Sequence, residues 1–396
     1  MPATWLHISD LHLRSGDSYD RDVVLRALVR SVRTFRERDG RAPDLIFATG
    51  DIAHSGAPDE YVVATRFFDE LLAAAGLNRA CLYVVPGNHD VDRTLGNQLS
   101  RTLYSRGDAD SYFDPRIPKL HLTQKLGSFL RWHQSYFDGV RAMPSDSTCG
   151  PVAAVEVRGH RIGVLPINTA LFCGVDGDHE KLFVGRRCLD TALKELDSLN
   201  ANLKIALLHH PPEFLSPLER QQIRAGLIDH VDIILTGHLH EAGIAGIDMW
   251  TGRNLYCAAG AAYQTRDWPN TAYYATFEGD RVGIFPVCYV DQPREVWTLD
   301  TSLFADEPGY QMSFPVPRDP NFRSFRLPEG WDGVFHPPVP KIGDAAKPAA
   351  GGPTTKPVRG ITIRAEAEDL PAKRAKKNEG GGKTGKNTKP KGKREN

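Results

Sequence analysis

The sequence predicts an α/β fold in which two mixed β-sheets pack face to face and helices flank them, giving a four-layer αββα sandwich. Two observations lead to this prediction. Short apolar strands alternate with amphipathic helices over the first 90 residues, as they do in parallel βαβ units. After residue 250 the chain changes to β-branched and aromatic runs separated by short turns, which is typical of antiparallel strands.

The first part of the chain is expected to supply three parallel strands and two helices. Apolar runs predict strands over residues 5–9, 45–50 and 81–85. Val24 and Leu28 belong to a series with four-residue spacing, which predicts an amphipathic helix over 20–38. Pro58 and the two acidic residues after it open a second helix over 58–75, because proline and acids favour the first helical turn. The C-terminal ends of parallel strands point the same way, so the loops after them are expected to converge.

Residues 92–148 interrupt this alternation and are expected to form a mostly helical insertion. They contain no β-branched run but many aromatic residues. One interpretation makes the segment a lid over the strand ends, with aromatic side chains and His121 or His133 facing a ligand. The other places the aromatics in a small core of the insertion itself. We prefer the second for most of them, because exposed aromatic stripes are uncommon on soluble proteins, although the segment as a whole is still expected to cover the site.

The alternation resumes after the insertion and then gives way to antiparallel strands. Strands are expected over residues 152–157, 161–165, 205–208 and 233–237, and helices over 186–199 and 216–229. A second series of strands is expected over residues 255–259, 272–277, 282–290 and 295–299. A turn at Gly279-Asp280 separates two of them. We expect this series to be antiparallel and to complete the second sheet.

Five of the predicted strands are followed at once by residues of metal-binding type. The blocks are Asp-Leu-His, Gly-Asp, Gly-Asn-His-Asp, His-His-Pro-Pro and Gly-His-Leu-His. They supply seven potential ligands, which are Asp10, His12, Asp51, Asn88, His209, His238 and His240. Three oxygen donors and four imidazoles, without a thiolate, suit Mn, Fe or Zn. Seven ligands are too many for one catalytic ion with an open position, so the set predicts two ions that share a carboxylate.

In this order, the five blocks resemble the calcineurin-like metallophosphoesterase family over residues 4–240. The resemblance implies two divalent metal ions, one held by Asp10, His12 and His240 and the other by Asn88, His209 and His238, with Asp51 as the bridge. Mn²⁺ is the expected metal, with Fe or Zn as alternatives. The Gly-Asp-x-Ala-x-x-Gly and His-His-Pro-Pro forms of the second and fourth blocks lean toward the prokaryotic cyclic-nucleotide phosphodiesterase branch.

The resemblance also implies roles for residues beside the metals. His89 would act as the general acid or contact the substrate phosphate, and Asn88 beside it is expected to contact the substrate as well. Asp90 cannot reach the metals if Asn88 does, so it is expected to hold His89 by a hydrogen bond as part of the catalytic machinery. For His210, contact with phosphate and support of the Pro211-Pro212 turn both stay open.

Any one of these blocks alone would be weak support for a metal site. A histidine next to a strand is usually a hydrogen-bonded, partly buried residue, and His7 and His54 are expected to be structural in this way. Five blocks in one order, each at a strand end, leave little room for a purely structural explanation of the whole set.

Composition and resemblance together divide the chain into three parts. Residues 1–305 are expected to form the catalytic domain, with the insertion as its lid. Residues 306–341, rich in Pro and Arg, are expected to form an extended arm. Residues 342–396 contain almost no large apolar side chains and are expected to be a disordered basic tail. Residues 371–396 alone carry ten Lys/Arg and two Glu, whereas the whole chain is neutral, so the rest of the chain is acidic.

The chain is expected to be cytoplasmic and not to enter a membrane. Its N-terminus leads directly into a strand, without the pattern of a signal peptide, and no apolar run approaches the ~20 residues of a spanning helix. Six cysteines without C-x-x-C spacing are expected to be reduced thiols. The sequence leaves the oligomeric state open.

These expectations lead to a metal-dependent phosphodiesterase that uses a hydroxide held between two metals. A cyclic or other small nucleotide-like phosphodiester is the expected substrate. The alternatives are a DNA or RNA nuclease whose basic tail binds nucleic acid, a phosphomonoesterase, and a binding module with a degenerate site. The acidic body argues against the nuclease, and the complete ligand set argues against the degenerate site.

Overall fold

The computed structural model describes residues 1–316 apart from several short segments, which are 17–18, 39–41, 97, 100, 115, 117–122, 144–146, 175–176, 241 and 250–251. All described residues belong to one compact unit, Met1–Gly330. Most of the predicted arm and all of the predicted tail lie outside the described residues. The first residues of the predicted arm, 306–316, contain a strand that pairs with the body.

The first sheet contains the three parallel strands that were expected at the start of the chain. They are β1 (Ala3–Ile8), β2 (Leu45–Thr49) and β3 (Leu82–Val85). Four antiparallel strands extend this sheet from β1, and they are β10 (Thr271–Glu278), β11 (Arg281–Val290), β12 (Val296–Leu299) and β13 (Met312–Pro315). The strand order is β12-β11-β10-β1-β2-β3, and β13 also pairs with β11.

The second sheet contains six strands in the order β4-β5-β6-β7-β9-β8. They are β4 (Ala153–Val157), β5 (His160–Pro166), β6 (Leu203–Leu207), β7 (Ile233–Thr236), β8 (Gly243–Met249) and β9 (Gly252–Ala258). Strands β5, β6, β7 and β9 are parallel, whereas β4 and β8 pair antiparallel at the two edges.

The expected pairing of the late strands is wrong in two respects. The segment predicted over 255–259 belongs to β9, which lies parallel to β7 in the second sheet, whereas β10, β11 and β12 extend the first sheet. Apolar alternation indicates a strand but does not identify its partner. The edge of β1 would leave its backbone groups unpaired, and β10 pairs with it there. Strand β8 was not expected, because its sequence contains two glycines, which are depleted in strands.

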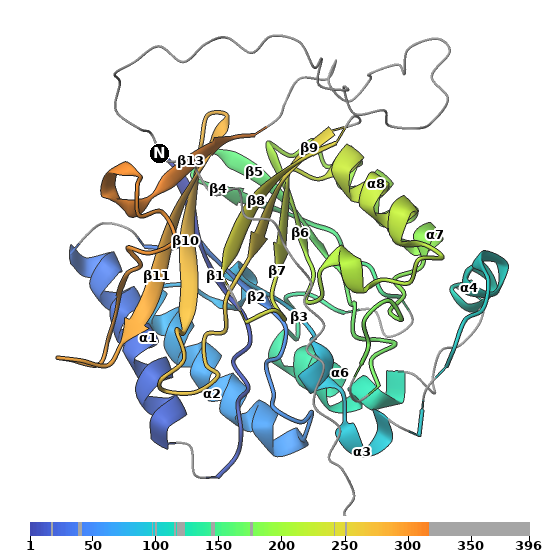
Figure 1. The fold of residues 1–396 in the computed structure, drawn as a ribbon, viewed down its shortest axis with the longest axis horizontal. Coiled ribbons are helices and arrows are strands. Elements are labelled where there is room, and N and C mark those ends of the chain that lie inside the picture. Colours follow the sequence, from blue (N-terminus) through green and yellow to red (C-terminus); the bar gives the residue numbers. More distant parts are fainter. Residues whose placement is uncertain are drawn as a thin grey trace, which may run out of the picture. The chain divides into compact units, whose positions relative to one another are not determined.

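Helices cover the outer faces of both sheets, as Figure 1 shows. On the first sheet lie α1 (Tyr19–Arg38) and α2 (Pro58–Ala75), with α6 (Gly127–Tyr136) beside α2. On the second sheet lie α7 (Arg186–Ser198) and α8 (Arg220–His230). Two short helices, α3 (Arg93–Gly96) and α4 (Arg106–Tyr112), belong to the insertion. Within the described part of the chain, no helix combines the length and the apolar character needed to cross a membrane.

Three hydrophobic cores fill the spaces between the four layers. On β1, Leu6 and Ile8 face the helices of the first sheet, while Trp5 faces the second sheet, following the two-residue period of a strand. Residues of β2, β3, β6 and β7 complete the core between the sheets. Helices α7 and α8 bury the third core. The predicted four-layer sandwich is therefore confirmed.

The aromatic residues of the insertion pack against the main body. Trp132 of α6 stacks on Tyr61 and Phe68 of α2, with ring centroids 5.4 and 6.0 Å apart. Phe113 packs against Phe172 in the core of the second sheet, at 5.8 Å. The preferred interpretation was partly wrong, because these rings are buried but extend the two outer cores and do not form a core of their own.

Candidate metal centre

The loops after five parallel strands meet at one edge of the two sheets. The loops after β1 and β2 are joined by backbone hydrogen bonds, because the amides of Leu11 and His12 both donate to the carbonyl oxygen of Asp51 at 2.9 Å. Ligands of open α/β sheets bind at the carboxyl ends of parallel strands, which is where these loops lie. The structure brings all seven predicted metal ligands to this edge.

The first group of ligand atoms comes from the loops after β1, β2 and β7. The group consists of Asp10, His12, Asp51 and His240, and the four ligand atoms lie within 4.8 Å of one another. Nε2 of His240 lies 3.2 Å from Oδ1 of Asp10 and 3.4 Å from Nε2 of His12. Asp10 and Asp51 are fully buried.

The second group is centred on the side-chain oxygen of Asn88. Nε2 of His209 lies 3.0 Å from Oδ1 of Asn88, and Nδ1 of His238 lies 3.1 Å from the same atom. Nε2 of His209 also lies 3.4 Å from Oδ1 of Asp51. Asp51 therefore lies within reach of both groups, between the two sets of imidazoles.

The orientation of the histidines fits a bound cation. Nδ1 of His209 donates to the carbonyl oxygen of Thr49 at 2.7 Å, and Nδ1 of His240 lies 2.8 Å from Oε1 of Gln264. These contacts fix each ring and leave Nε2 directed toward the carboxylates, as in metal-binding histidines. The two Nε2 atoms of His12 and His240 face each other, and at most one of them can donate to the other. A cation between them would bind both lone pairs.

Burial and neighbouring charges set the protonation of these groups. Burial lowers the pKa of His12 and of His238 to about 4 each, so both rings are neutral and can supply a lone pair. Burial also lowers the pKa of His209, but the nearby Asp51 carboxylate outweighs it and raises the pKa to about 9. Burial opposes ionisation of Asp51, yet the charge of His209 holds the pKa of Asp51 well below its usual range.

The backbone at the ligand positions is unusual. Five of the seven predicted ligands have positive φ angles, and they are Asp10 (54°), His12 (44°), Asp51 (51°), His238 (73°) and His240 (57°). Residues other than glycine seldom adopt this region, and where they do, the strained conformation often marks a functional site. The chain therefore holds these side chains in place against local conformational preference.

Close approaches between loops explain why glycine precedes the ligand in the second and third blocks. A Cβ atom at Gly87 would overlap the carboxylate of Asp51, and one at Gly50 would overlap the ring of His209. Gly50 also has a φ of 92°, which side chains rarely tolerate. Glycine at these positions lets the loops after β2, β3 and β6 approach one another closely.

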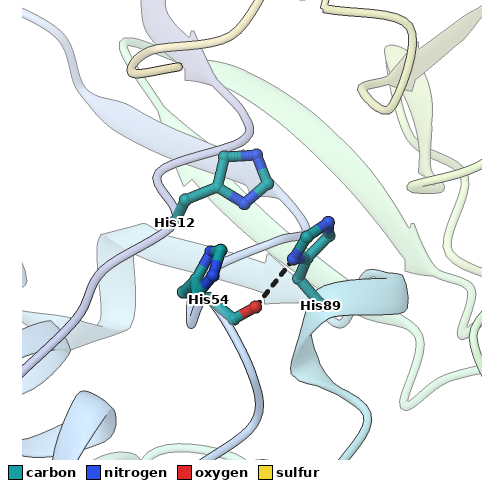
Figure 2. A group of neighbouring side chains, drawn as sticks. All are labelled: His12, His54 and His89. Atoms are coloured by element: carbon teal, nitrogen blue, oxygen red, sulfur yellow. Dashed lines mark hydrogen bonds between the residues drawn. The ribbon is translucent and has the colours of Figure 1, made fainter. Parts of the chain in front are cut away.

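His89 belongs to a second imidazole cluster on the open side of these groups. His12, His54 and His89 have ring nitrogens within 4.8 Å of one another, and Figure 2 shows the three rings together. Nδ1 of His89 donates to the carbonyl oxygen of His54 at 2.7 Å. His54 was expected to be structural, but it lies in this cluster. His7 matches its expected structural role, because it is buried and hydrogen-bonded to Thr49 at 2.9 Å.

Asp90 does not hold His89 as expected. Its carboxylate is buried and accepts hydrogen bonds from the backbone amides of Ile52, Ala53 and Gly87 at 3.1, 2.9 and 2.9 Å. The hydroxyl of Tyr61 donates to the same carboxylate at 2.9 Å. Asp90 therefore joins the loops after β2 and β3, and the residue that holds the His89 ring is His54.

His210 is engaged by protein groups on both ring nitrogens. Nδ1 lies 2.8 Å from the hydroxyl of Thr169, and Nε2 lies 3.7 Å from Sγ of Cys173. The ring is fully buried and packs edge-on against His209, with centroids 4.7 Å apart. Of the two interpretations left open, this environment favours support of the loop over contact with phosphate.

A cleft of about 680 Å³ opens next to these histidines. It is lined by His12, Arg14, Tyr19, Asp20, Arg21, His54, His89, His240, Tyr263, Gln264 and Thr265. No described residue of the insertion lines it, so the predicted lid position finds no support in the described part of the segment. Arg93 of α3 does contact the edge of the His89 ring, with Nη2 3.0 Å from Nδ1 and 3.3 Å from Nε2, and only Nε2 is free to accept its hydrogen bond. His133 is buried against Phe137, and His121 lies outside the described residues.

Several residues of this site were missed from the sequence, among them Arg14, Arg93 and Gln264. Arg14 lies two positions after His12, so its place in the same loop could have indicated it. Arg93 lies four positions after His89 and could have been recognised in the same way. Gln264 carries no such signal, because its loop lies far along the chain and reaches His240 only in the folded structure.

Comparisons with known proteins agree with this arrangement. A profile of the calcineurin-like phosphoesterase family matches residues 3–242. The "uncharacterized metallophosphoesterase-like protein YydB" of Bacillus subtilis is 28% identical over 257 residues, which cover 61% of this chain and 50% of the relative. The "probable cyclic nucleotide phosphodiesterase" of Rhodococcus erythropolis is 26% identical over 255 residues, 61% of this chain and 67% of the relative. The chain thus spans about half the length of the Bacillus protein.

Solved structures share the fold. The chain superposes on the structure of PhoD with a TM-score of 0.50 and 10% sequence identity, covering 80% of this chain and 70% of the other. At this identity, the likeness shows the fold alone.

Proposed function

Because this chain belongs to the calcineurin-like phosphoesterase family, whose members depend on two metal ions, we propose that it hydrolyses a small, nucleotide-like phosphodiester. We assign Asp10, His12 and His240 to one metal ion, Asn88, His209 and His238 to the other, and Asp51 to both. Mn²⁺ is the metal that we propose, since the donor set combines imidazoles with oxygen ligands and contains no thiolate. When bound, such a pair of cations withdraws charge from phosphoryl oxygens and lowers the pKa of coordinated water.

The observation that supports a diester is the shape of the cleft. It continues past His12, His54 and His89 to Tyr19 and Tyr263, and its volume of about 680 Å³ lies within the range of small-molecule sites. The cleft is large enough to hold both substituents of a small diester. The two tyrosine rings would provide a surface for the base of a nucleotide. The relative named a probable cyclic nucleotide phosphodiesterase also favours this class of substrate.

The chain's own residues would then position the substrate and move one proton. The hydrogen bond from Nδ1 of His89 to the carbonyl of His54 fixes the ring, so Nε2 is the atom that would exchange a proton with the departing oxygen. Arg93 adds positive charge beside that ring. The nuclease alternative depends on the basic tail, which lies outside the described residues, so it stays a prediction from the sequence.

The proposal is tested by comparing substrates with the full chain in Mn²⁺. We expect kcat/KM for bis-p-nitrophenyl phosphate and for 3′,5′-cyclic AMP to exceed that for p-nitrophenyl phosphate by about 10-fold or more, because both diesters are larger and contact more of the cleft. Single- and double-stranded DNA serve as the polymeric comparison. Faster hydrolysis of the monoester would instead indicate a phosphomonoesterase, and faster hydrolysis of DNA than of cyclic AMP would indicate a nuclease.

A further inference from the structure

The wall of the cleft next to His54 carries an arginine whose charge has no partner in the described structure. Arg14 is exposed and lines the cleft, and its Nη2 lies 3.1 Å from Nδ1 of His54. Among the described residues, no carboxylate lies within ion-pair distance of Arg14. Because a guanidinium can only donate, Nδ1 of His54 is the acceptor in this contact.

The other arginine and the aspartate that line the cleft take part in ion pairs. Arg21 is buried, and its Nη2 lies 3.5 Å from the carboxylate of Asp22. Asp20 is bound by Arg266 at 3.2 Å, and Arg266 also binds Asp291 and Glu295. Of the two arginines among the described residues that line the cleft, Arg14 is therefore the one without an ion pair.

Contacts at both ends hold Arg14 in place. The carbonyl oxygen of Arg14 accepts a hydrogen bond from Nη2 of the buried Arg21 at 2.9 Å, while its guanidinium rests on His54. A guanidinium that is already positioned loses less conformational entropy when it binds an anion. Its planar arrangement of donors matches the oxygens of a phosphate group.

The position of Arg14 separates it from the reacting phosphoryl group. The guanidinium of Arg14 contacts the ring of His54, whose centroid lies 5.5 Å from that of His89 and 6.2 Å from that of His12. An anion on Arg14 would therefore lie about one imidazole ring away from a phosphoryl group held beside His12 and His89. This spacing suits two anionic groups of one small molecule.

We propose that Arg14 forms a second anion subsite, and that the preferred substrate is a phosphodiester that also carries a terminal phosphate group. This inference rests on the proposed phosphodiesterase function and names its substrate class more narrowly. Arg14 is a specificity-determining residue in this view, and Tyr19 and Tyr263 line the space for the body of the substrate.

The test uses two substrates that differ only in the second anion. They are the dinucleoside monophosphate adenylyl-(3′→5′)-adenosine and its 5′-phosphorylated form. We expect kcat/KM to be about 5- to 10-fold higher for the phosphorylated form, as for a charge-assisted contact at an exposed site. The difference should reside in KM, because the contact forms away from the reacting atoms. It should shrink at high salt, since the pair is exposed.

Variants identify the residue responsible. Arg14→Gln should bring the ratio of the two kcat/KM values close to one, and Arg14→Lys, which keeps the charge without the planar donors, should give an intermediate ratio. Arg33→Gln is the matched control, because Arg33 is an exposed arginine of α1 outside the cleft and its loss changes the net charge equally. This control should keep the wild-type ratio. Circular dichroism verifies that each variant is folded.

Two outcomes would overturn the inference. One is equal kcat/KM for the two substrates in the wild-type protein. The other is a wild-type ratio that persists in Arg14→Gln, and an equal loss on both substrates in that variant would place Arg14 on the reacting phosphoryl group. Calorimetric titration with both compounds measures the same preference as binding, so it decides the inference even if neither is hydrolysed. Absence of hydrolysis with intact, Arg14-dependent binding would reject only the proposed function.

Discussion

Asp51→Asn should lower kcat for bis-p-nitrophenyl phosphate on the order of 10³-fold while the protein stays folded. Asparagine keeps the shape of the side chain and can still accept the hydrogen bond from the backbone amide of His89, which is 2.8 Å long. It removes the negative charge that lies within reach of both ligand groups. A metal pair contributes several kcal/mol to stabilisation of the transition state, and each 1.4 kcal/mol corresponds to about a factor of 10 in rate.

The measurement combines steady-state kinetics at saturating Mn²⁺ with elemental analysis of the dialysed protein. Glu70→Gln on α2 is a suitable control, because it removes one negative charge from an exposed position outside the cleft. We expect that control to keep both its metal content and its rate. Near wild-type turnover in Asp51→Asn would show that the carboxylate is not needed to organise the site.

Asp90→Ala should destabilise the protein by about 3–5 kcal/mol, an effect that its sequence position beside His89 would not suggest. The substitution leaves three buried backbone amides and the hydroxyl of Tyr61 without their acceptor. Each unsatisfied buried group costs about 1–3 kcal/mol, and partial relaxation of the loops would recover some of this loss. The amides belong to the loops that carry Asp51 and Asn88, so metal affinity should fall as well.

Urea unfolding of the metal-free protein measures this effect. We expect a lower midpoint with an unchanged slope, which reports lower stability and not a different denatured state. Asp90→Asn retains one acceptor oxygen but turns an amide group toward the backbone donors, so its midpoint should lie below that of the wild type. If Asp90→Ala unfolded at the wild-type midpoint, the carboxylate would not be the link between the two loops.

Parts of the fold followed directly from local chemistry. The helix expected over 58–75 coincides with α2, because Pro58 stands at its first turn and Gly76, with a φ of 75°, ends it. The meeting of the ligand loops followed from the parallel strands that precede them, since such strands end at the same edge. The seven side chains could therefore be placed together without knowledge of the packing of the sheets.

Other features could not be predicted, because they depend on contacts between distant residues. The strand over 271–278 has the same alternation whichever sheet it joins, and only the open edge of β1 decides its place. Asp90 follows His89 in sequence, but the short 3₁₀ turn Asn88–Asp90 directs its carboxylate to the backbone of the loop after β2. His54 contacts His89 through its carbonyl oxygen, and Gln264 reaches His240 from a distant loop. Neither contact can be recognised from a sequence motif.

The central claim is that two ions bind between the seven side chains, and diffraction at the manganese absorption edge tests it most directly. Crystals of the full chain grown with Mn²⁺ should show two anomalous peaks about 3.5–4 Å apart, as in other two-metal hydrolases. One peak should lie beside Asp10, His12 and His240 and the other beside Asn88, His209 and His238. A single peak, or peaks away from these residues, would contradict the account.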